Sequence, residues 1–146
     1  MLFYYDYTYW MMLLPVLLIT IYAQAKVSSN FNKYSRITNR RYLTGAQAAE
    51  AVLRQHGIYD VRIERVAGKL TDHYDPRTNV IRLSSSVYDS PTIAAVGVAA
   101  HEAGHAVQYA VGYGPIRLRS ALIPVTQVGS QFGIVLLFLG IILSFE

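Results

Sequence analysis

Two long stretches without charged side chains stand near the ends of this chain, and they constrain its fold more than any other feature. No charged residue occurs in residues 7–25, and none occurs in the 26 residues 120–145. At about 1.5 Å of rise per residue, a helix of either length can cross a bilayer core of roughly 30 Å. We therefore expect a transmembrane anchor over residues 1–25 and a second transmembrane helix over residues 121–146.

The charges beside these stretches predict how the chain is oriented in a membrane. Five basic residues and no acidic residue occur in residues 26–41, whereas Asp6 precedes the first stretch. Arg117 and Arg119 lie just before the second stretch. Basic residues mark the cytoplasmic side, so we expect a multi-pass protein of the cell membrane whose central region lies in the cytoplasm. A cleaved signal peptide is the alternative, but its amino-terminal region would carry Lys or Arg rather than Asp6.

The region between the stretches divides into two parts by composition. Residues 26–43 are basic and polar, which predicts a juxtamembrane linker that is loose over residues 28–35. Residues 44–120 are expected to form a compact domain. The formal net charge is +4, but the basic residues gather beside the apolar stretches and lack interleaved aromatic side chains. We therefore expect the lipid bilayer, and no nucleic acid, as the partner of these charges.

The compact domain begins with a predicted helix. Thr44 and Gln47 have the spacing of a capping box, which predicts a helix over residues 46–55 that ends before Gly57. The apolar stripe of this helix should pack on the rest of the domain. His56 is expected to be a helix-terminus residue rather than a metal ligand.

A strand and a hairpin are predicted next. Residues 61–66 favour a strand, and residues 70–84 favour two arms around a turn in which Pro76 occupies its preferred second position. The edge of such a hairpin can bind an extended peptide through its backbone. A purely structural hairpin that covers the core is the alternative.

A second helix is predicted from Pro91 to about Val111. Ser90 has a side chain typical of an N-cap, Pro91 is favoured at the first helical position, and glycines follow the expected end. Gly97 and Gly104 each lower the stability of a helix interior by about 1 kcal/mol relative to Ala. We therefore expect a neighbouring element to approach closely at these two glycines.

This second helix carries the motif with the clearest chemistry, His101-Glu102-Ala103-Gly104-His105. His101 and His105 project from one helix face, one turn apart, and can therefore ligate the same zinc ion. Glu102 is rotated by about 100° from His101, where its carboxylate can accept a proton from a zinc-bound water. The run before the motif is almost free of polar side chains, so we expect buried surroundings in which a metal compensates the charge. The chain has no cysteine, so nitrogen and oxygen atoms must hold the metal.

Gln108 lies three residues after His105 on the same helix face. Its side chain can contact a substrate or orient the His105 ligand. An amide that is merely packed is the alternative.

Several segments together resemble one protein family. Residues 72–77, 82–84, 87–88 and 99–108 are similar to the motifs of the YugP-type neutral zinc metallopeptidases of bacterial membranes. The resemblance extends over nearly the whole chain. It implies an α+β membrane protein in which a small gluzincin-like domain, built from a helix, a short hairpin or sheet and the motif helix, lies between two transmembrane helices. It also implies His101 and His105 as ligands of Zn²⁺, Glu102 as the catalytic base and a peptide or protein as substrate.

One feature departs from the gluzincin pattern. Such enzymes take a third zinc ligand, usually Glu, from a helix downstream of the motif. The only acidic residue after His105 is Glu146, which a charge-free helix would carry to the far side of the bilayer. We therefore expect this chain to be the amino-terminal part of a longer protein that supplies the ligand. The alternative is an upstream ligand among Asp72, His73 and Asp75.

Together these observations predict a membrane-anchored, zinc-dependent metalloendopeptidase with residues 44–120 as its zinc metallopeptidase domain. A zinc-activated water would attack the peptide bond, and Glu102 would act as the general base. A non-catalytic membrane scaffold that retains an incomplete zinc site is the alternative. The sequence identifies no protein partner that would supply or cover the site.

Overall fold

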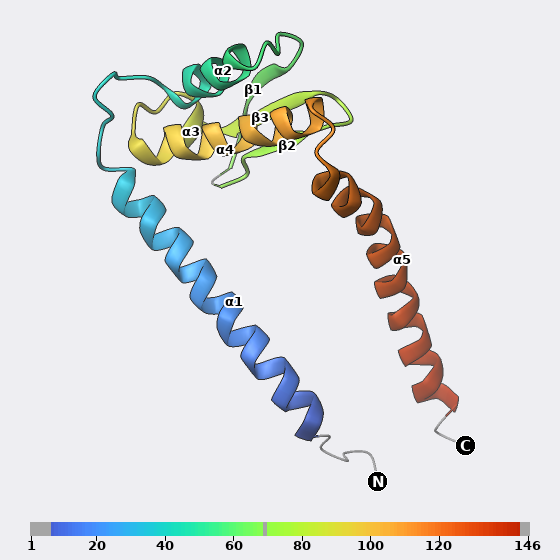
Figure 1. Ribbon diagram of the computed structural model, residues 1–146. Helices are drawn as coiled ribbons and strands as arrows, with labels where there is room; N and C mark the ends of the chain where they lie inside the picture. The colour runs from blue at the N-terminus through green and yellow to red at the C-terminus, as the bar shows by residue number, and fades with distance from the viewer. Residues whose placement is uncertain (1–6, 69, 144–146) are drawn as a thin grey trace.

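The computed structural model describes residues 7–68 and 70–143 and shows a small α+β domain carried on two long helices (Figure 1). This architecture confirms the predicted fold class. In chain order the elements are α1 (Tyr7–Tyr34), α2 (Gly45–Gln55), β1 (Arg62–Val66), β2 (His73–Asp75), β3 (Val80–Ser84), α3 (Ser85–Tyr88), α4 (Ile93–Ala110) and α5 (Gly114–Leu143).

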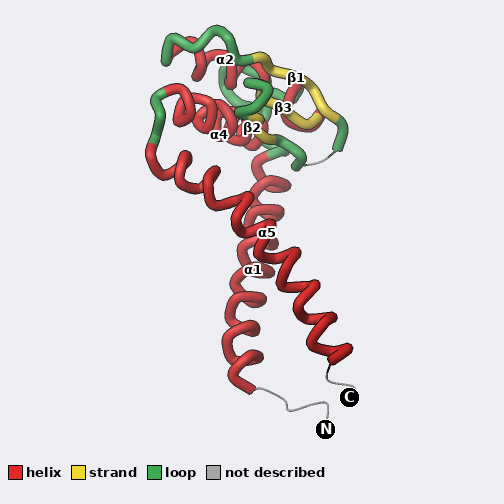
Figure 2. Tube along the Cα trace, turned by 90° about the vertical axis from the view of Figure 1, so that its right-hand side faces the viewer, coloured by secondary structure: helices red, strands yellow, loops and turns green. Residues whose placement is uncertain are grey.

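The two long helices, α1 and α5, leave the domain on the same side in both views (Figures 1 and 2). Both are long and apolar enough to cross a membrane, and the apolar part of each is not buried by the rest of the protein. They contain the two stretches predicted as transmembrane. The outer ends of the predicted anchors, residues 1–6 and 144–146, lie outside the described residues, and so does the Glu146 considered above.

The predicted loose linker is wrong for its first part, because α1 continues through it to Tyr34. Phe31 in this last part of α1 packs against the domain core. The Ser35 hydroxyl donates a hydrogen bond to the carbonyl oxygen of Phe31 at 2.6 Å. Contact with the domain therefore holds the polar end of α1 in a helix that its composition alone did not predict.

Three short strands form one sheet in the order β1-β3-β2. β2 and β3 are antiparallel, which confirms the predicted hairpin, and β1 pairs with β3 in parallel. β1 and β2 therefore occupy the two edges, and β3 is buried between them. β2 also contacts α4, so this edge of the sheet faces the helix that carries the motif.

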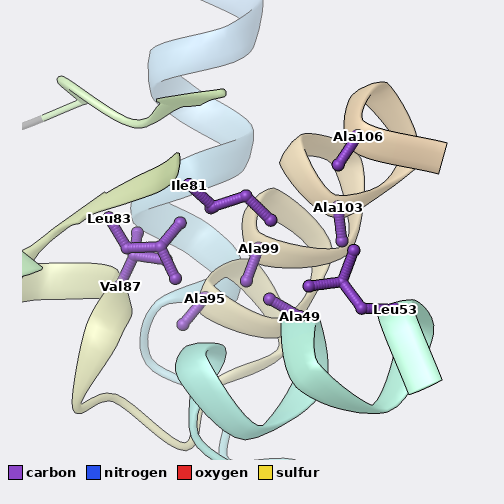
Figure 3. Close-up of a cluster of buried hydrophobic side chains, with 9 residues drawn as sticks. All are labelled: Ala49, Leu53, Ile81, Leu83, Val87, Ala95, Ala99, Ala103 and Ala106. Carbon is purple, nitrogen blue, oxygen red and sulfur yellow. The ribbon is translucent and has the colours of Figure 1, made fainter. Parts of the chain in front are cut away.

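The core is built from small side chains of α4 (Figure 3). Four alanines spaced three or four residues apart line one face of α4 and are fully or almost fully buried. Small side chains allow α2 to lie close to α4, and packing of the predicted apolar stripe of α2 is confirmed. The cluster consists of Ala95, Ala99, Ala103 and Ala106 of α4 with Ala49, Leu53, Ile81, Leu83 and Val87.

The capping box predicted for α2 is present. The Thr44 hydroxyl accepts from the Gln47 backbone N–H at 3.3 Å, and the Gln47 side-chain oxygen accepts from the Thr44 N–H at 2.9 Å. His56 is the C-cap of the helix, and Gly57 follows with a φ of 70°. His56 is therefore a helix-terminus residue, as predicted.

The start of α4 lies two residues later than predicted, because Thr92 rather than Ser90 is the N-cap. The Ser90 carbonyl accepts from the N–H of Gly45 at 3.2 Å, and the Pro91 carbonyl accepts from the N–H of Asn39 at 2.9 Å. Both carbonyls are thus bonded to distant segments of the chain. The sequence around the helix start cannot reveal these tertiary bonds.

The predicted close approach at Gly97 and Gly104 is also wrong. A Cβ atom added at either glycine would meet no atom within 4 Å. At Gly45, in contrast, an added Cβ would overlap the carbonyl oxygen of Val87. The close approach that requires glycine therefore occurs at the start of α2.

Candidate metal centre

His101 and His105 lie on the side of α4 that points away from the core alanines, whereas Ala103 of the motif is itself part of the core. The ring centroids of His101 and His105 are 4.6 Å apart, with their planes at 75°. The structure thus brings the two predicted ligands together. His101 is exposed and His105 is half-buried, so the expectation of a buried site is wrong. The alanines before the motif bury one face of the helix only, which leaves the histidine face open.

Gln108 orients the His105 ring. Its Oε1 lies 3.0 Å from Nδ1 of His105. A neutral His105 that carries its proton on Nδ1 would donate to this oxygen and keep the lone pair of Nε2 for a metal. Such a partner fixes the tautomer and the ring direction of a metal-binding histidine. Of the roles considered for Gln108, the contact favours orientation of the ligand.

The carboxylate of Glu102 reaches the edge strand β2. Its Oε2 accepts a hydrogen bond from the backbone N–H of Tyr74 at 3.1 Å. This N–H is directed toward α4 rather than β3, so it belongs to the free edge of the sheet. Sequence reasoning missed the contact because a backbone amide has no side-chain signature and the partners are 28 positions apart. The candidate base is thus held at the edge where an extended peptide would pair.

The side chain of Tyr74 ties β2 to its surroundings. Its ring lies 5.6 Å from the ring of Tyr109 on α4, and its hydroxyl donates to Asn79 Oδ1 at 2.8 Å. Burial, and then the negative charge of Asp60, raise the pKa of the Tyr74 phenol. The hydroxyl therefore remains protonated and keeps its role as a donor.

Asp75 organises the turn of the hairpin. Its Oδ1 accepts from the Arg77 backbone N–H at 2.9 Å, and its Oδ2 accepts from the Thr78 hydroxyl at 2.7 Å and from Arg82 at 3.2 Å. These bonds, that of the Thr78 hydroxyl first, lower the pKa of Asp75 to about 2. The carboxylate is therefore ionised and engaged within the hairpin.

No upstream candidate joins the two histidines. Asp72 is bonded to the backbone and hydroxyl of Ser84, Asp75 is engaged in its turn, and the exposed His73 bonds to a backbone carbonyl. Within residues 7–68 and 70–143, no group of three His, Asp or Glu side chains could hold a metal ion. The described residues therefore do not show an upstream third ligand, and that alternative stays a prediction.

Two open hollows flank the motif. One, of about 500 Å³, has His105 in its wall together with Tyr74 and residues of α5. The other, of about 480 Å³, has His101 and Glu102 in its wall together with residues of α1. A further hollow of about 540 Å³ lies between α2 and β1, away from the motif. The motif is thus reachable from both sides.

Comparison with known proteins identifies the family of this chain. A model of the family described as "Putative neutral zinc metallopeptidase" matches residues 9–146. The chain belongs to this family. The resemblance found in the sequence is therefore confirmed, and the neutral zinc metallopeptidase family is the setting in which the site is interpreted.

A curated relative agrees with this assignment. The "Putative membrane protease YugP" of Bacillus subtilis (strain 168) is 47% identical over 122 residues, which cover 84% of this chain and 54% of the relative. The chain thus spans about half the length of the curated relative that it matches. No solved structure gives a significant match.

The neutral zinc metallopeptidase family implies a zinc ion, and the motif residues fit part of what zinc requires. Two imidazoles one helical turn apart are a usual pair of zinc ligands, and Nε2 of His105 is free to bind. His101 and His105 are therefore the residues that would hold the ion. Catalytic zinc sites take three protein ligands, and the described residues bring together only these two.

Proposed function

We propose that this protein is a membrane-anchored, zinc-dependent metalloendopeptidase, with His101 and His105 as metal ligands and Glu102 as general base. The observation that carries the proposal is their arrangement. The two imidazole rings are adjacent at 4.6 Å, and the Glu102 carboxylate beside them is bonded to the free edge of β2 at 3.1 Å. Membership of a zinc metallopeptidase family supports the same chemistry.

The residues divide the work of peptide hydrolysis as follows. Zinc, when bound, supplies a Lewis acid that polarises a carbonyl group and lowers the pKa of water to about 7. Glu102 accepts the proton of the attacking water and passes it to the leaving amine. The backbone of Tyr74 binds the extended substrate, whose carbonyl replaces Glu102 on the Tyr74 N–H. This exchange frees the carboxylate for proton transfer as the substrate enters.

The proposal includes the orientation of the protein in the cell membrane. Helices α1 and α5 are the two spans, and the domain lies on the cytoplasmic side. The basic residues at the domain ends of both helices support this orientation. The partners are the bilayer and a peptide or protein substrate, and nucleic acid is not among them.

Replacement of the base tests the proposal. Glu102→Gln removes the proton acceptor but keeps the size of the side chain, so we expect peptide hydrolysis to fall by a factor of about 10²–10⁴ while zinc content is unchanged. Hydrolysis of an unstructured peptide and elemental analysis of the purified protein measure the two quantities. Glu50→Gln, at an exposed position of α2, is the matched control and should retain the parent rate. A Glu102→Gln variant as fast as the parent would contradict the assignment.

A second candidate function is a membrane scaffold that binds zinc without catalysis. The observation that favours it is the pair of ligands, without a third, among the described residues. A scaffold would hold zinc through His101 and His105 and hydrolyse no peptide. The two candidates therefore differ in the parent protein itself, before any variant is made.

A further inference from the structure

Two hollows lie beside the motif: the first has His101 and Glu102 in its wall, and the second has His105 in its wall. The two hollows together are called the cleft below. On the strand side, Asp72 lines the first hollow and Tyr74 lines the second. On the α4 side, Glu102 lines the first hollow and His105 lines the second. Residues 72–74 and α4 therefore contribute to the walls of both hollows. The Glu102–Tyr74 hydrogen bond joins a wall residue of the first hollow to a wall residue of the second.

Helix α1 walls the first end of this cleft. Gln24 and Val27 line the hollow beside His101. Lys26, the first charged residue after the charge-free part of α1, lies between them in the sequence. This end of the cleft therefore lies at the level where α1 passes from apolar to charged sequence.

Helix α5 walls the other end at the corresponding level. Arg119, Ile123 and Gln127 line the hollow beside His105, and no charged residue follows Arg119 in the described part of α5. Ile123 and Gln127 lie about 6 and 12 Å beyond Arg119 along the helix. The polar zone of each bilayer leaflet is roughly 5–8 Å thick. Measured from Arg119, Ile123 therefore lies within that zone, whereas Gln127 lies past its inner limit.

The charges of the second hollow suit the same location. Arg77 and Arg119 both line it, and neither side chain has an ion-pair partner within residues 7–68 and 70–143. Arginines without an acidic partner are attracted to the anionic headgroups of the inner leaflet. The wall residues on α1 and α5 thus belong to the domain ends of the two helices, which leave the domain on the same side (Figures 1 and 2).

We propose that the cleft binds an extended juxtamembrane segment of a membrane-anchored polypeptide, that is, the residues directly after its exit from the bilayer. The membrane anchor of the polypeptide holds such a segment at the same height as the cleft, so the segment can lie along the edge of β2. A loop of a folded soluble protein would meet the bilayer before it reached this edge. The cleavage of that segment rests on the function proposed above, whereas its binding does not.

A tethered probe tests the location of cleavage. The probe is a synthetic polypeptide with a Leu/Ala span of roughly 20 residues and a tail of four identical ten-residue repeats, placed with the parent protein in phosphatidylethanolamine–phosphatidylglycerol vesicles. Mass spectrometry maps the cleaved bonds. We expect roughly tenfold more cleavage in the first repeat than in the fourth, because the tail places only the first repeat at the height of the cleft. Equal cleavage in all repeats would overturn the proposal and leave the peptidase function standing.

Disulfide capture tests binding without hydrolysis. The chain has no cysteine, so Glu102→Gln protein that also carries Ile123→Cys has one thiol at the α5 end of the cleft. Probes carry a single cysteine in the first or in the fourth repeat. The first-repeat probe should be captured roughly tenfold faster. Tyr59→Cys is the matched control, because Tyr59 is 80% exposed in the loop between α2 and β1, away from α1 and α5 in Figure 1.

The two measurements separate the proposals. Selective capture of the first repeat without any hydrolysis by the parent protein would support the juxtamembrane cleft and contradict the peptidase. Equal capture of both probes at Ile123→Cys, or capture that is as fast at Tyr59→Cys, would overturn the juxtamembrane cleft. Absence of capture and of cleavage would overturn it as well.

Discussion

A substitution at Gln108 tests the orientation of the proposed ligand His105 without changing the ligand itself. Oε1 of Gln108 lies 3.0 Å from Nδ1 of His105, where it would hold the ring in the direction that the proposed metal site requires. A zinc ligand held in this way needs no reorientation when the ion binds. Shortening the Gln108 side chain does not change the backbone of α4.

Gln108→Ala should therefore weaken zinc binding by a factor of about 10–100, without unfolding the domain. Competition with a chromogenic chelator measures the dissociation constant, and circular dichroism checks the helix content. Gln55→Ala, an exposed position at the end of α2, should bind zinc like the parent. An unchanged dissociation constant for Gln108→Ala would show that His105 does not depend on this contact.

Ionisation of Asp75 makes the stability of the hairpin depend on pH. A carboxyl with a lowered pKa stabilises the folded state above its unfolded value of 3.8, and this contribution is lost as the pH falls toward the folded value of about 2. Asp75→Asn should therefore speed hydrogen exchange of the β2 and β3 amides at pH 7. The difference from the parent should shrink between about pH 4 and pH 2. Asp89→Asn, outside the hairpin, is the control, and a difference that persists unchanged at pH 2 would contradict the assignment.

Helix geometry explains which features of the individual residues could be predicted from the sequence. His101, Glu102 and His105 could be predicted as a site because helix periodicity alone fixes their relative directions. The exposure of His101 and the contact of Glu102 with Tyr74 depend on which face of α4 packs on the core. Packing of α2 and the sheet against α4 determines which face is buried, and the motif sequence alone does not reveal it.

Among the elements, α4 owes its position to close packing on α2. Its buried face is lined by alanines, and α2 begins at Gly45 directly against the carbonyl oxygen of Val87. Any added atom at Gly45 must push α2 away from α3. The glycines of α4 itself have free space around them.

Two glycine substitutions should therefore have opposite effects on stability. Gly45→Ala should lower the free energy of unfolding by about 1–3 kcal/mol through overpacking. Gly104→Ala should raise it by about 1 kcal/mol, because alanine is the better helix former and the added methyl group meets no neighbour. Thermal unfolding in detergent measures both. Stabilisation by Gly45→Ala would mean that α2 is free to shift.

Local signals predicted the elements better than their junctions. The capping box of Thr44 and Gln47 was predictable because both partners lie within one turn. The N-cap of α4 was misplaced because Asn39 and Gly45 occupy the carbonyls of Pro91 and Ser90. The helical end of α1 was missed for the same kind of reason, since Phe31 is held by a core that lies far along the chain.

For the whole molecule, single cysteines test the orientation in the membrane. In intact bacterial host cells, Tyr59→Cys should be protected from a membrane-impermeant maleimide and should react after lysis. Tyr7→Cys, at the start of α1, should react in intact cells, because the proposed orientation places it outside. Labelling of Tyr59→Cys in intact cells would contradict the cytoplasmic domain. Absence of label at Tyr7→Cys after lysis would indicate a cleaved leader.

The segment that follows α1 is joined to the first turn of α4. Thr38 bridges Thr92, the N–H of Ile93 donates to the Ile37 carbonyl at 2.9 Å, and the Asn39 side chain donates to the Pro91 carbonyl at 2.6 Å. A soluble fragment trimmed back to residue 44 would strip these partners from the helix that carries both histidines. Preparations intended for crystallisation or metal titration should therefore retain residues 37–43 even where α1 is removed.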